Sequence, residues 1–479
     1  MGEVSRRDFI KGLIGGLIVG GIVGVAGGYV AAPGKEKTIT ATKTVTSEKT
    51  VTKTVTQQTQ SIQQTILPVT ETTTTTVTKP VTTTVTKTVA APKEKVKVGW
   101  IYVGPIGDYG WTYAHNSGRL YVEKVLGHAI ETMYVESVPE AQAGPAIESL
   151  IEKGCKVIFT TSFGFMDPTL EAAKKHSDIW FWHCSGYKRW RNMGTYFAEL
   201  YQPYYLCGIA AAAVSKTLKF GYVAAFPIPE VVRHINSWVL GIWEGLWHRV
   251  KRGELSWDDL KKVEVHVKWL YSWYDPPKAT DAARTLVEQF DADVLAFTED
   301  SPATLQVAEE YQKKGKKVWS YSHYSDMRDY GPHAHLMGQL VDWGLMYEYI
   351  LAYYLAGAPR SMDLWWLMGD GGDTYEGWRK GRGAAFYWLD KWGDFKAHPA
   401  LPDWAKKLIL HREQLMKERY WDPWNADFWT PFFEKLTGKK GIVDREGKTR
   451  LEPGEVGDHD LLWSIDWFVW GLAEPVPKG

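Results

Sequence analysis

The feature that most constrains the fold is an alternation of short apolar runs with amphipathic stretches, and it begins at residue 96. The first pair is VKVGWIYVGPIGDYGWTYAHNSGRLYVEKVLG (96–127). Val96–Val103 has the length of a buried strand, the Gly- and Pro-containing loop 104–110 interrupts it, and an amphipathic helix is expected over 111–126. Gly127 stands where a helix-terminating glycine belongs. Strand, loop and helix in this order open a parallel sheet.

The alternation continues along the chain and restarts after about 120 residues, which predicts an α/β fold of two doubly wound, Rossmann-like lobes with a hinge and a cleft between them. We expect the first lobe to span about 94–215 plus 319–479, and the second about 216–318. In the C-terminal third, the pattern predicts helices over 343–356, 402–419 and 458–472 and a strand–turn–strand over 441–451. These pieces are expected to return to the first lobe.

The N-terminal part reads as an anchor and a stalk. SRRDFIK (5–11) resembles a twin-arginine signal, and the uncharged apolar stretch 12–33 is long enough to span a bilayer. We therefore expect a signal or membrane anchor over 1–34. The Thr-rich tract 35–93 maintains no apolar face, which predicts a disordered stalk. Anchor, stalk and a substrate-binding domain over 94–479 together describe a protein tethered to the membrane and displayed outside the cell.

Composition excludes several classes of protein. The 56 acidic and 56 basic side chains cancel, so the concentrated basic face of a nucleic-acid binder is not expected. The three cysteines, Cys155, Cys184 and Cys207, have no metal-ligand spacing and are expected to be buried free thiols. No GxSxG, HExxH or paired CxxC motif occurs, so neither a catalytic residue, a metal nor a cofactor is expected. His323, His333 and His335 are expected to lie on a surface loop.

Several loops that follow predicted strands carry recognition chemistry. Because carboxyl ends of parallel strands meet at one edge of a sheet, these loops should border the cleft. Aromatic faces that stack and carboxylates that accept hydrogen bonds suit a planar, nitrogen-rich ligand. Asp275 and Ser301, which precede prolines, are instead expected to cap helices. The candidate ligand-binding residues are Asp108, Trp111, Ser162, Phe163, Trp273, Asp300, Asp326 and Asp342.

Six collinear motifs carry a resemblance to a known family. They are GPIGD (104–108), TTSFGFMDP (160–168), SGYK (185–188), FPIPEV (226–231), SWYDP (272–276) and DSP (300–302). Over about 96–345 the chain resembles the BMP (basic membrane protein) family of ABC-transporter substrate-binding lipoproteins, which are related to purine-nucleoside receptors. The resemblance implies a periplasmic-binding-protein type I fold that closes on a purine and delivers it to an ABC permease. An anchor and stalk in place of a lipidated cysteine is typical of archaeal cell-surface binders.

In nucleoside-binding members of the family, two aromatic side chains sandwich the base, which implies this role for Trp111 and Trp273. By position, the resemblance implies that Asp108, Asp300, Asp326 and Asp342 hold the polar edges of the ligand. Nucleoside-binding relatives have a lysine where Asp342 falls, which argues against ribose binding and favours a free base such as adenine. The expected ligand of this monomeric receptor is a purine base or a nucleoside. Two alternatives stay open: a surface hydrolase acting on nucleosides or glycans, and a sugar-binding receptor. The Trp-rich stretch 364–392 has no assigned role.

Overall fold

The computed structural model describes residues 38–45, 81–88, 94–371, 385–388 and 398–478. Within the Thr-rich tract, β1 (Thr38–Val45) and β2 (Val81–Thr88) pair as antiparallel strands in a compact unit separate from the globular region. The sequence predicted no regular structure there. Threonine and valine are β-branched and favour extended backbone, which accounts for the difference. The predicted leader and the rest of the stalk lie outside the described residues.

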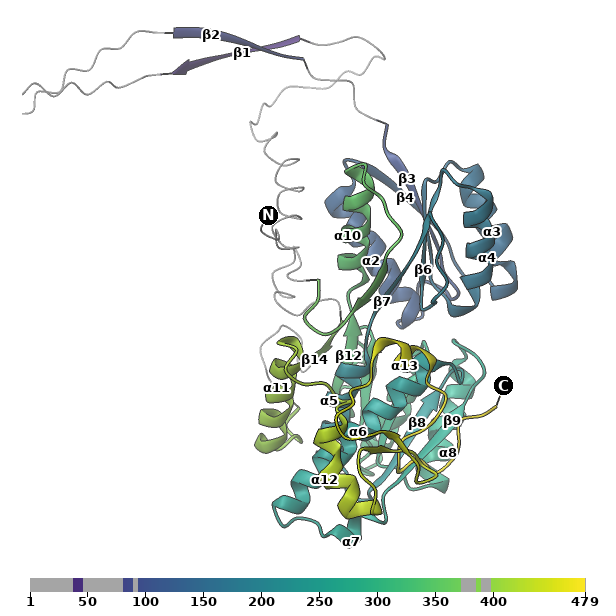
Figure 1. The fold of residues 1–479 in the computed structure, drawn as a ribbon, viewed down its shortest axis with the longest axis vertical. Helices are drawn as coiled ribbons and strands as arrows, with labels where there is room; N and C mark the ends of the chain where they lie inside the picture. Colours follow the sequence, from purple (N-terminus) through teal and green to yellow (C-terminus); the bar gives the residue numbers. More distant parts are fainter. Residues whose placement is uncertain (1–37, 46–80, 89–93, 372–384, 389–397, 479) are drawn as a thin grey trace, which may run out of the picture. The chain divides into compact units, whose positions relative to one another are not determined.

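The first lobe (residues 95–198 and 343–371) is built on one six-stranded sheet in which all neighbouring strands are parallel. In sheet order its strands are β13 (Asp363–Trp366), β7 (Met193–Ala198), β6 (Trp180–Cys184), β5 (Val157–Thr160), β3 (Val96–Ile101) and β4 (Ile130–Val135). Figure 1 shows two layers of helices around it, α2 (Trp111–Leu126) with α10 (Trp343–Leu355) on one face and α3 (Ala143–Glu152) with α4 (Met166–Lys175) on the other. Short 3₁₀ turns, η1 (Glu140–Gln142) and η2 (Phe163–Phe165), precede α3 and α4.

The second lobe (residues 201–341, 385–388 and 398–478) contains a second sheet made of two groups of strands. The first group, in sheet order, is β9 (Glu264–Trp269), β8 (Lys219–Ala224) and β10 (Val294–Thr298), all parallel. The other is β11 (Ser320–Tyr324), β12 (His335–Val341) and β14 (Ala385–Trp388), with β14 antiparallel to β12. Backbone hydrogen bonds join the two groups next to β10, from Leu295 N to Trp319 O (2.8 Å) and from Trp319 N to Asp293 O (2.9 Å).

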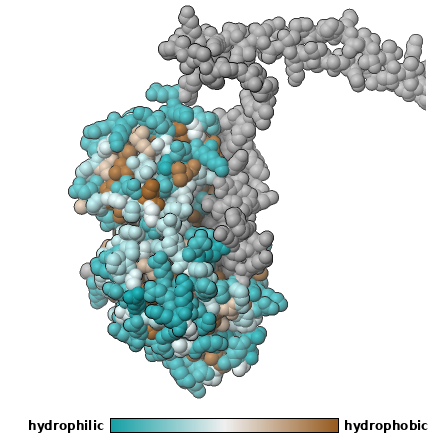
Figure 2. Space-filling model, turned by 180° about the vertical axis from the view of Figure 1, so that it is seen from behind, coloured by the Kyte–Doolittle hydropathy of each residue, from teal (hydrophilic) through white to brown (hydrophobic). Residues whose placement is uncertain are grey.

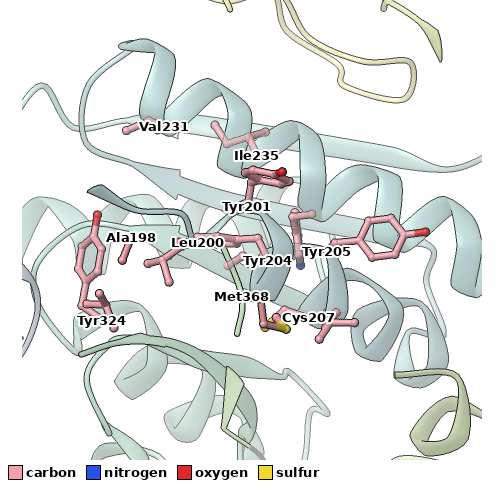
Figure 3. Close-up of a cluster of buried hydrophobic side chains, with 14 of the residues drawn as sticks. Ala198, Leu200, Tyr201, Tyr204, Tyr205, Cys207, Val231, Ile235, Tyr324 and Met368 are labelled. Carbon is pink, nitrogen blue, oxygen red and sulfur yellow. The ribbon is translucent and has the colours of Figure 1, made fainter. Parts of the chain in front are cut away.

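Two helices, α5 (Tyr201–Val214) and α6 (Pro229–Lys251), form the centre of the second lobe. Glycines let their backbones touch: a Cβ added at Gly208 would lie 2.0 Å from the Trp238 carbonyl oxygen, and one at Gly241 would lie 2.0 Å from that of Tyr205. Figure 3 shows the apolar side chains around this contact, including Tyr204 and Ile235. The remaining elements before the C-terminal region are α7 (Trp257–Leu260), α8 (Pro276–Gln289), α9 (Ala303–Lys313) and η3 (Arg328–Tyr330).

The C-terminal region adds α11 (Asp403–Lys417), α12 (Ala426–Thr437), β15 (Ile442–Val443), β16 (Thr449–Leu451) and α13 (His459–Ser464). It packs mainly on the second lobe. Two residues of α6 bind this region. Ser237 Oγ accepts a hydrogen bond from Trp424 Nε1 (3.1 Å), and Asn236 Nδ2 donates to the Trp467 carbonyl oxygen (2.8 Å). The helix predicted over 458–472 is therefore largely wrong: α13 ends at Ser464, the chain after it is irregular with a turn, and Leu472 forms a parallel bridge with Val265 of β9.

The lobe boundaries also differ from those expected. The helix over 201–214 packs on α6 rather than on the first sheet, and β11 and β12 extend the second sheet beyond residue 318. Of the described segments after 319, only α10 and β13 return to the first lobe. Local periodicity identifies these strands and helices, but long-range backbone pairing decides which sheet each one joins.

Most large aromatic side chains are structural. The fully buried tryptophans include Trp100, Trp238, Trp243, Trp343, Trp424 and Trp429. The three cysteines are buried and unpaired, as predicted. In Figure 2, exposed apolar residues gather over the upper, first lobe, whereas the lower lobe is mainly hydrophilic. Among the helices that the structure describes, none is both long and apolar enough to cross a bilayer; the predicted anchor is outside that part.

Candidate functional site

A small cavity lies where loops at the carboxyl ends of both sheets meet. The first lobe contributes residues that follow β3, β5 and β6. The second contributes residues that follow β8, β9 and β10, and the last residue of β11. This is the edge at which open α/β sheets bind ligands. The lining consists of Val103, Trp111, Ser162, Phe163 and Ser185 from the first lobe and Glu230, Trp273, Asp300 and Tyr324 from the second.

Trp111 is held rigidly at the start of α2. Its indole Nε1 donates to the Thr161 carbonyl oxygen, and its ring meets the Tyr324 ring edge-on at 5.1 Å across the cleft. A second edge contact, with Trp343 at 5.4 Å, fixes it from behind. Because the indole N–H is already used, this side chain can offer a ligand only its apolar ring surface.

Trp273 supplies an aromatic wall on the second lobe. Its ring packs against Phe226 at 5.1 Å, and its carbonyl oxygen accepts a hydrogen bond from Asp300 N at 2.8 Å. The ring position is therefore tied to the loop that carries Asp300. Asp275, two residues after Trp273, caps α8 by accepting from Lys278 N at 3.1 Å, as the sequence predicted.

Two buried carboxyl groups face the cavity from the second lobe. Asp300 is 1% exposed, and its Oδ1 has no hydrogen-bond partner among the described residues. Burial raises the pKa of Asp300, and the nearby carboxylates of Asp108, Glu299 and Glu230 raise it further. Glu230 accepts hydrogen bonds from Ser185 Oγ and from Tyr324 OH (2.9 Å), and burial raises its pKa as well. These groups are acceptors placed for a ligand that donates hydrogen bonds.

Contacts across the cleft show that the lobes are closed on one another. The Ser185–Glu230 hydrogen bond joins the lobes at the cavity, and Ser325 Oγ donates to the Tyr109 carbonyl oxygen at its edge. A Cβ added at Gly110 would lie 2.6 Å from the Asp300 Cα. The β3–α2 loop therefore rests directly on the β10–α9 loop.

Five of the eight predicted site residues line this cavity: Trp111, Ser162, Phe163, Trp273 and Asp300. The other three have local partners instead. Asp108 accepts hydrogen bonds from the backbone N–H groups of Gly110, Thr112 and Tyr113 (2.9–3.0 Å), and burial raises its pKa to about 6. Asp326 pairs with Arg328 at 2.5 Å, and Asp342 caps α10 through Gly344 N at 3.2 Å.

Sequence reasoning missed Ser185, Glu230 and Tyr324 as lining residues. Ser185 lies in the SGYK motif and Glu230 in the FPIPEV motif. Both motifs served only to establish the family resemblance, although they could have pointed to these two residues. Tyr324 follows a predicted strand and carries no motif. In the structure, Ser185 (φ 72°) and Tyr324 (φ 61°) adopt left-handed backbone, a strained conformation that concentrates at ligand sites.

The described residues include no group of three or more His, Cys, Asp or Glu side chains placed to hold a metal ion. The three histidines expected on a surface loop do not all lie on the surface. His323 and His335 are buried in β11 and β12, and only His333 is exposed. Tyr204 OH hydrogen-bonds His323 Nδ1 at 2.9 Å, so this imidazole belongs to the core. The expectation of a surface loop is wrong for two of the three.

Two parallel-sheet lobes, joined by crossing segments and closed over a cavity at their strand ends, define the periplasmic-binding-protein type I fold. Solved structures agree. A solute-binding protein of an ABC transporter system from Aeropyrum pernix K1 superimposes with a TM-score of 0.54 at 15% identity, covering 77% of this chain and 95% of its own. A transcriptional activator of the comK gene from Bacillus halodurans superimposes with a TM-score of 0.51 at 20% identity, covering 68% of this chain and 99% of its own.

The chain belongs to the Bmp family, described as ABC transporter substrate-binding protein PnrA-like, whose model matches residues 95–372. A purine-binding protein from Brucella abortus is 34% identical over 390 residues, covering 81% of this chain and 96% of its own. A Haloferax volcanii protein, provisionally named an ABC transporter glucose-binding protein, is 33% identical over 285 residues, covering 60% and 68%. The family consists of solute-binding proteins that work outside the cytoplasm with an ABC permease.

Proposed function

We propose that this protein captures a purine base outside the cell and delivers it to an ABC permease. The observation that carries the proposal is the chemistry of the cavity between the lobes. Aromatic rings of Trp111, Phe163 and Trp273 surround it, and carboxyl groups of Asp300 and Glu230 face it. The lining, as far as the structure describes it, includes no lysine, arginine or histidine. Rings stack on a planar heterocycle, and buried acceptors bind its N–H edges.

The side chains at the cavity favour a free base over a nucleoside, because its lining, as far as the structure describes it, includes no lysine. Asp342, where nucleoside-binding relatives have a lysine, caps α10 and does not line the cavity. The name of the Brucella abortus relative is consistent with a purine ligand. The name of the Haloferax volcanii relative makes sugars the necessary comparison.

We further propose that the protein is a monomer held at the outer face of the cell membrane by residues 1–34, with the Thr-rich tract 35–93 as the spacer. Support comes from the sequence alone, in the SRRDFIK motif followed by the apolar stretch 12–33. Fractionation of cells that produce the full chain tests the tether. Recovery in the membrane fraction, with sensitivity of intact cells to added protease, is expected; recovery in the medium contradicts the tether.

Binding is tested by calorimetry and thermal unfolding of the chain from residue 94, with adenine, other purine bases, nucleosides and sugars. A base at about 100 times its Kd should stabilise the protein by roughly 2.7 kcal/mol. Asp300→Asn should weaken base binding by about five- to a hundredfold, because an amide N–H in place of an acceptor oxygen leaves a ligand donor unpaired at a cost of about 1–3 kcal/mol. Asp326→Asn, the same change at a residue outside the cavity, should leave the affinity unchanged.

Three results would contradict the proposal. Stabilisation by sugars alone would keep the receptor and overturn the purine ligand. Chemical conversion of the base or nucleoside during long incubation would favour the hydrolase. Equal affinities of wild type and Asp300→Asn for the base would place the ligand elsewhere.

A further inference from the structure

A second cavity, more open to solvent, lies away from the ligand cleft. Its walls come from four segments far apart in the sequence: the start of α5, the end of β13, the α11–α12 connection and the loop before α13. The family model ends at residue 372, so the last two segments lie beyond the part of the chain that it matches. Neither the family nor the proposed function assigns a role to this cavity.

The cavity lies beside the segments that connect the lobes. Tyr201 and Gln202 begin α5 directly after the chain leaves the first lobe, and Figure 3 shows Tyr201 with Met368 among the side chains around this helix. The backbone N–H of Met368 donates to Gln202 Oε1 at 2.9 Å. Glu199 N donates to the Trp366 carbonyl oxygen at 2.8 Å. Two connecting segments are thus bonded to each other at one wall of the cavity.

The C-terminal region forms the opposite wall and is tied to the same segments. One oxygen of Asp422, Oδ2, accepts hydrogen bonds from Tyr201 OH (2.7 Å) and from Gln202 Nε2 (3.0 Å). Arg419 forms an ion pair with Asp370 at 2.5 Å. These bonds hold the cavity in shape without filling it, so it is a preformed site, as small-molecule sites usually are.

The side chains at the cavity combine aromatic surface with neutral and acidic polar groups. Tyr420 is 77% exposed, and Trp365 and Trp421 are partly exposed beside it. The indole N–H groups of both tryptophans are buried without a hydrogen-bond partner in the described structure. Because these N–H groups are buried, the two tryptophans offer a ligand only their rings. Amides of Gln202 and Asn425 add further polar groups.

The charges at this cavity select against anionic ligands. Asp422 and Asp458 disfavour a phosphate or carboxylate, and the Arg419 guanidinium is already engaged by Asp370. What remains is aromatic surface ringed by hydrogen-bonding groups, which fits the apolar faces and hydroxyl edges of a sugar. We propose that this cavity is a second ligand site, that it binds a neutral sugar, and that it does so independently of the base bound between the lobes.

The test uses the full chain, both alone and with adenine at saturating concentration, and measures binding of glucose, trehalose and maltose by saturation-transfer NMR. At least one of the three should bind while adenine stays bound. Tyr420→Ala should weaken that binding at least fivefold, because it removes the most exposed ring. Tyr134→Ala, the same change on the β4 edge of the first lobe, is the matched control and should have no effect. Val456→Trp, at a half-exposed position of the lining, should block the site without disturbing the core.

The outcomes separate this site from the ligand cleft. Sugar binding that Tyr420→Ala and Val456→Trp reduce, and that Asp300→Asn leaves intact, supports the second site whether or not the purine proposal holds. Sugar binding that adenine displaces and Asp300→Asn abolishes places the sugar between the lobes and overturns the second site. Absence of binding by all three sugars to the adenine-saturated protein also overturns it.

Discussion

At the scale of single residues, the cavity between the lobes depends on side chains whose positions are set by other contacts. Trp111 is tied down through its indole N–H, whereas Trp273 is only half-buried and packs on Phe226. The two tryptophans therefore differ in what their removal would do. Loss of Trp111 would disturb the core, but loss of Trp273 mainly removes ligand contact.

We expect Trp273→Ala to weaken binding of a purine base by about 1–3 kcal/mol, the value of one aromatic–base stacking contact. The melting temperature of the unliganded protein should change little, because the ring is partly exposed. Titration calorimetry with wild type, Trp273→Ala and the ring-preserving Trp273→Phe measures this. Unchanged affinity in the alanine variant would remove Trp273 from the site.

The acidic residues near the cavity make stability depend on pH. Burial raises the pKa of Glu299 to about 8 and that of Asp108 to about 6, above their values in an unfolded chain. At these two carboxyl groups the folded protein keeps protons that the unfolded chain has lost between about pH 4 and 8, so their contribution to stability falls as pH rises through this range. Buried histidines act in the opposite direction below about pH 6.5: burial lowers the pKa of His183 to about 4, so the unfolded chain binds the extra proton there.

Glu299→Gln should reduce that dependence, because a glutamine cannot lose a proton. Oε2 of Glu299 accepts from Ser301 N at 2.8 Å, and the glutamine oxygen can replace this acceptor. We expect denaturant unfolding of the unliganded protein at pH 5, 6.5 and 8 to show a steeper decline in wild type than in Glu299→Gln. If stability changed with pH to the same extent in both proteins, Glu299 would not be a source of the pH dependence. Asp329→Asn, on the exposed turn η3, is the control.

At the scale of elements, α6 is joined to the segment between β7 and α5 by a buried ion pair. Arg233 Nε and Nη2 donate to the two carboxylate oxygens of Glu199 at 3.0 and 2.6 Å. The guanidinium lies over the ring of Trp463, 4.7 Å from its centre. The pair thus connects the crossing segment, the main helix of the second lobe and the C-terminal region.

Arg233→Met should destabilise the protein by about 3–5 kcal/mol, because it leaves the Glu199 carboxylate buried without its partner. The double variant Arg233→Met, Glu199→Gln should recover much of that loss, since no unpaired charge remains. Lys174→Met, which breaks an exposed pair with Glu171, should cost at most about 1 kcal/mol. Equilibrium unfolding in guanidinium chloride measures all three. A double variant no more stable than Arg233→Met would show that the buried charge is not the cause.

At the scale of the whole molecule, the two lobes are in contact and the protein is in its closed form. A ligand favours the closed form only if it binds that form better than the open one. The contact is closest where Gly110 of the first lobe rests on the Asp300 backbone of the second. A side chain at residue 110 has no room in the closed form.

We expect Gly110→Ala to weaken ligand binding at least about tenfold, a cost of about 1.4 kcal/mol or more to closure. In small-angle X-ray scattering, ligand should reduce the radius of gyration of wild type but not that of Gly110→Ala. Gly107→Ala is the matched control in the same loop, because a Cβ there would meet nothing within 4 Å. Equal behaviour of the two variants would show that the β3–α2 loop does not limit closure.

The sequence by itself determined the class of fold, the order of most strands and helices, and five residues of the candidate cavity. These follow from local information: hydrophobic period, capping residues such as Asp275, and motifs at strand ends. Tertiary structure alone decided that α5, β11 and the C-terminal region belong to the second lobe, because backbone pairing between distant segments sets sheet membership. It also placed Glu230 and Tyr324 in the cavity, and turned Asp326 and Asp342 toward local partners. A carboxylate in a strand-end loop can either face a ligand or satisfy a nearby donor, and only the packed chain decides between them.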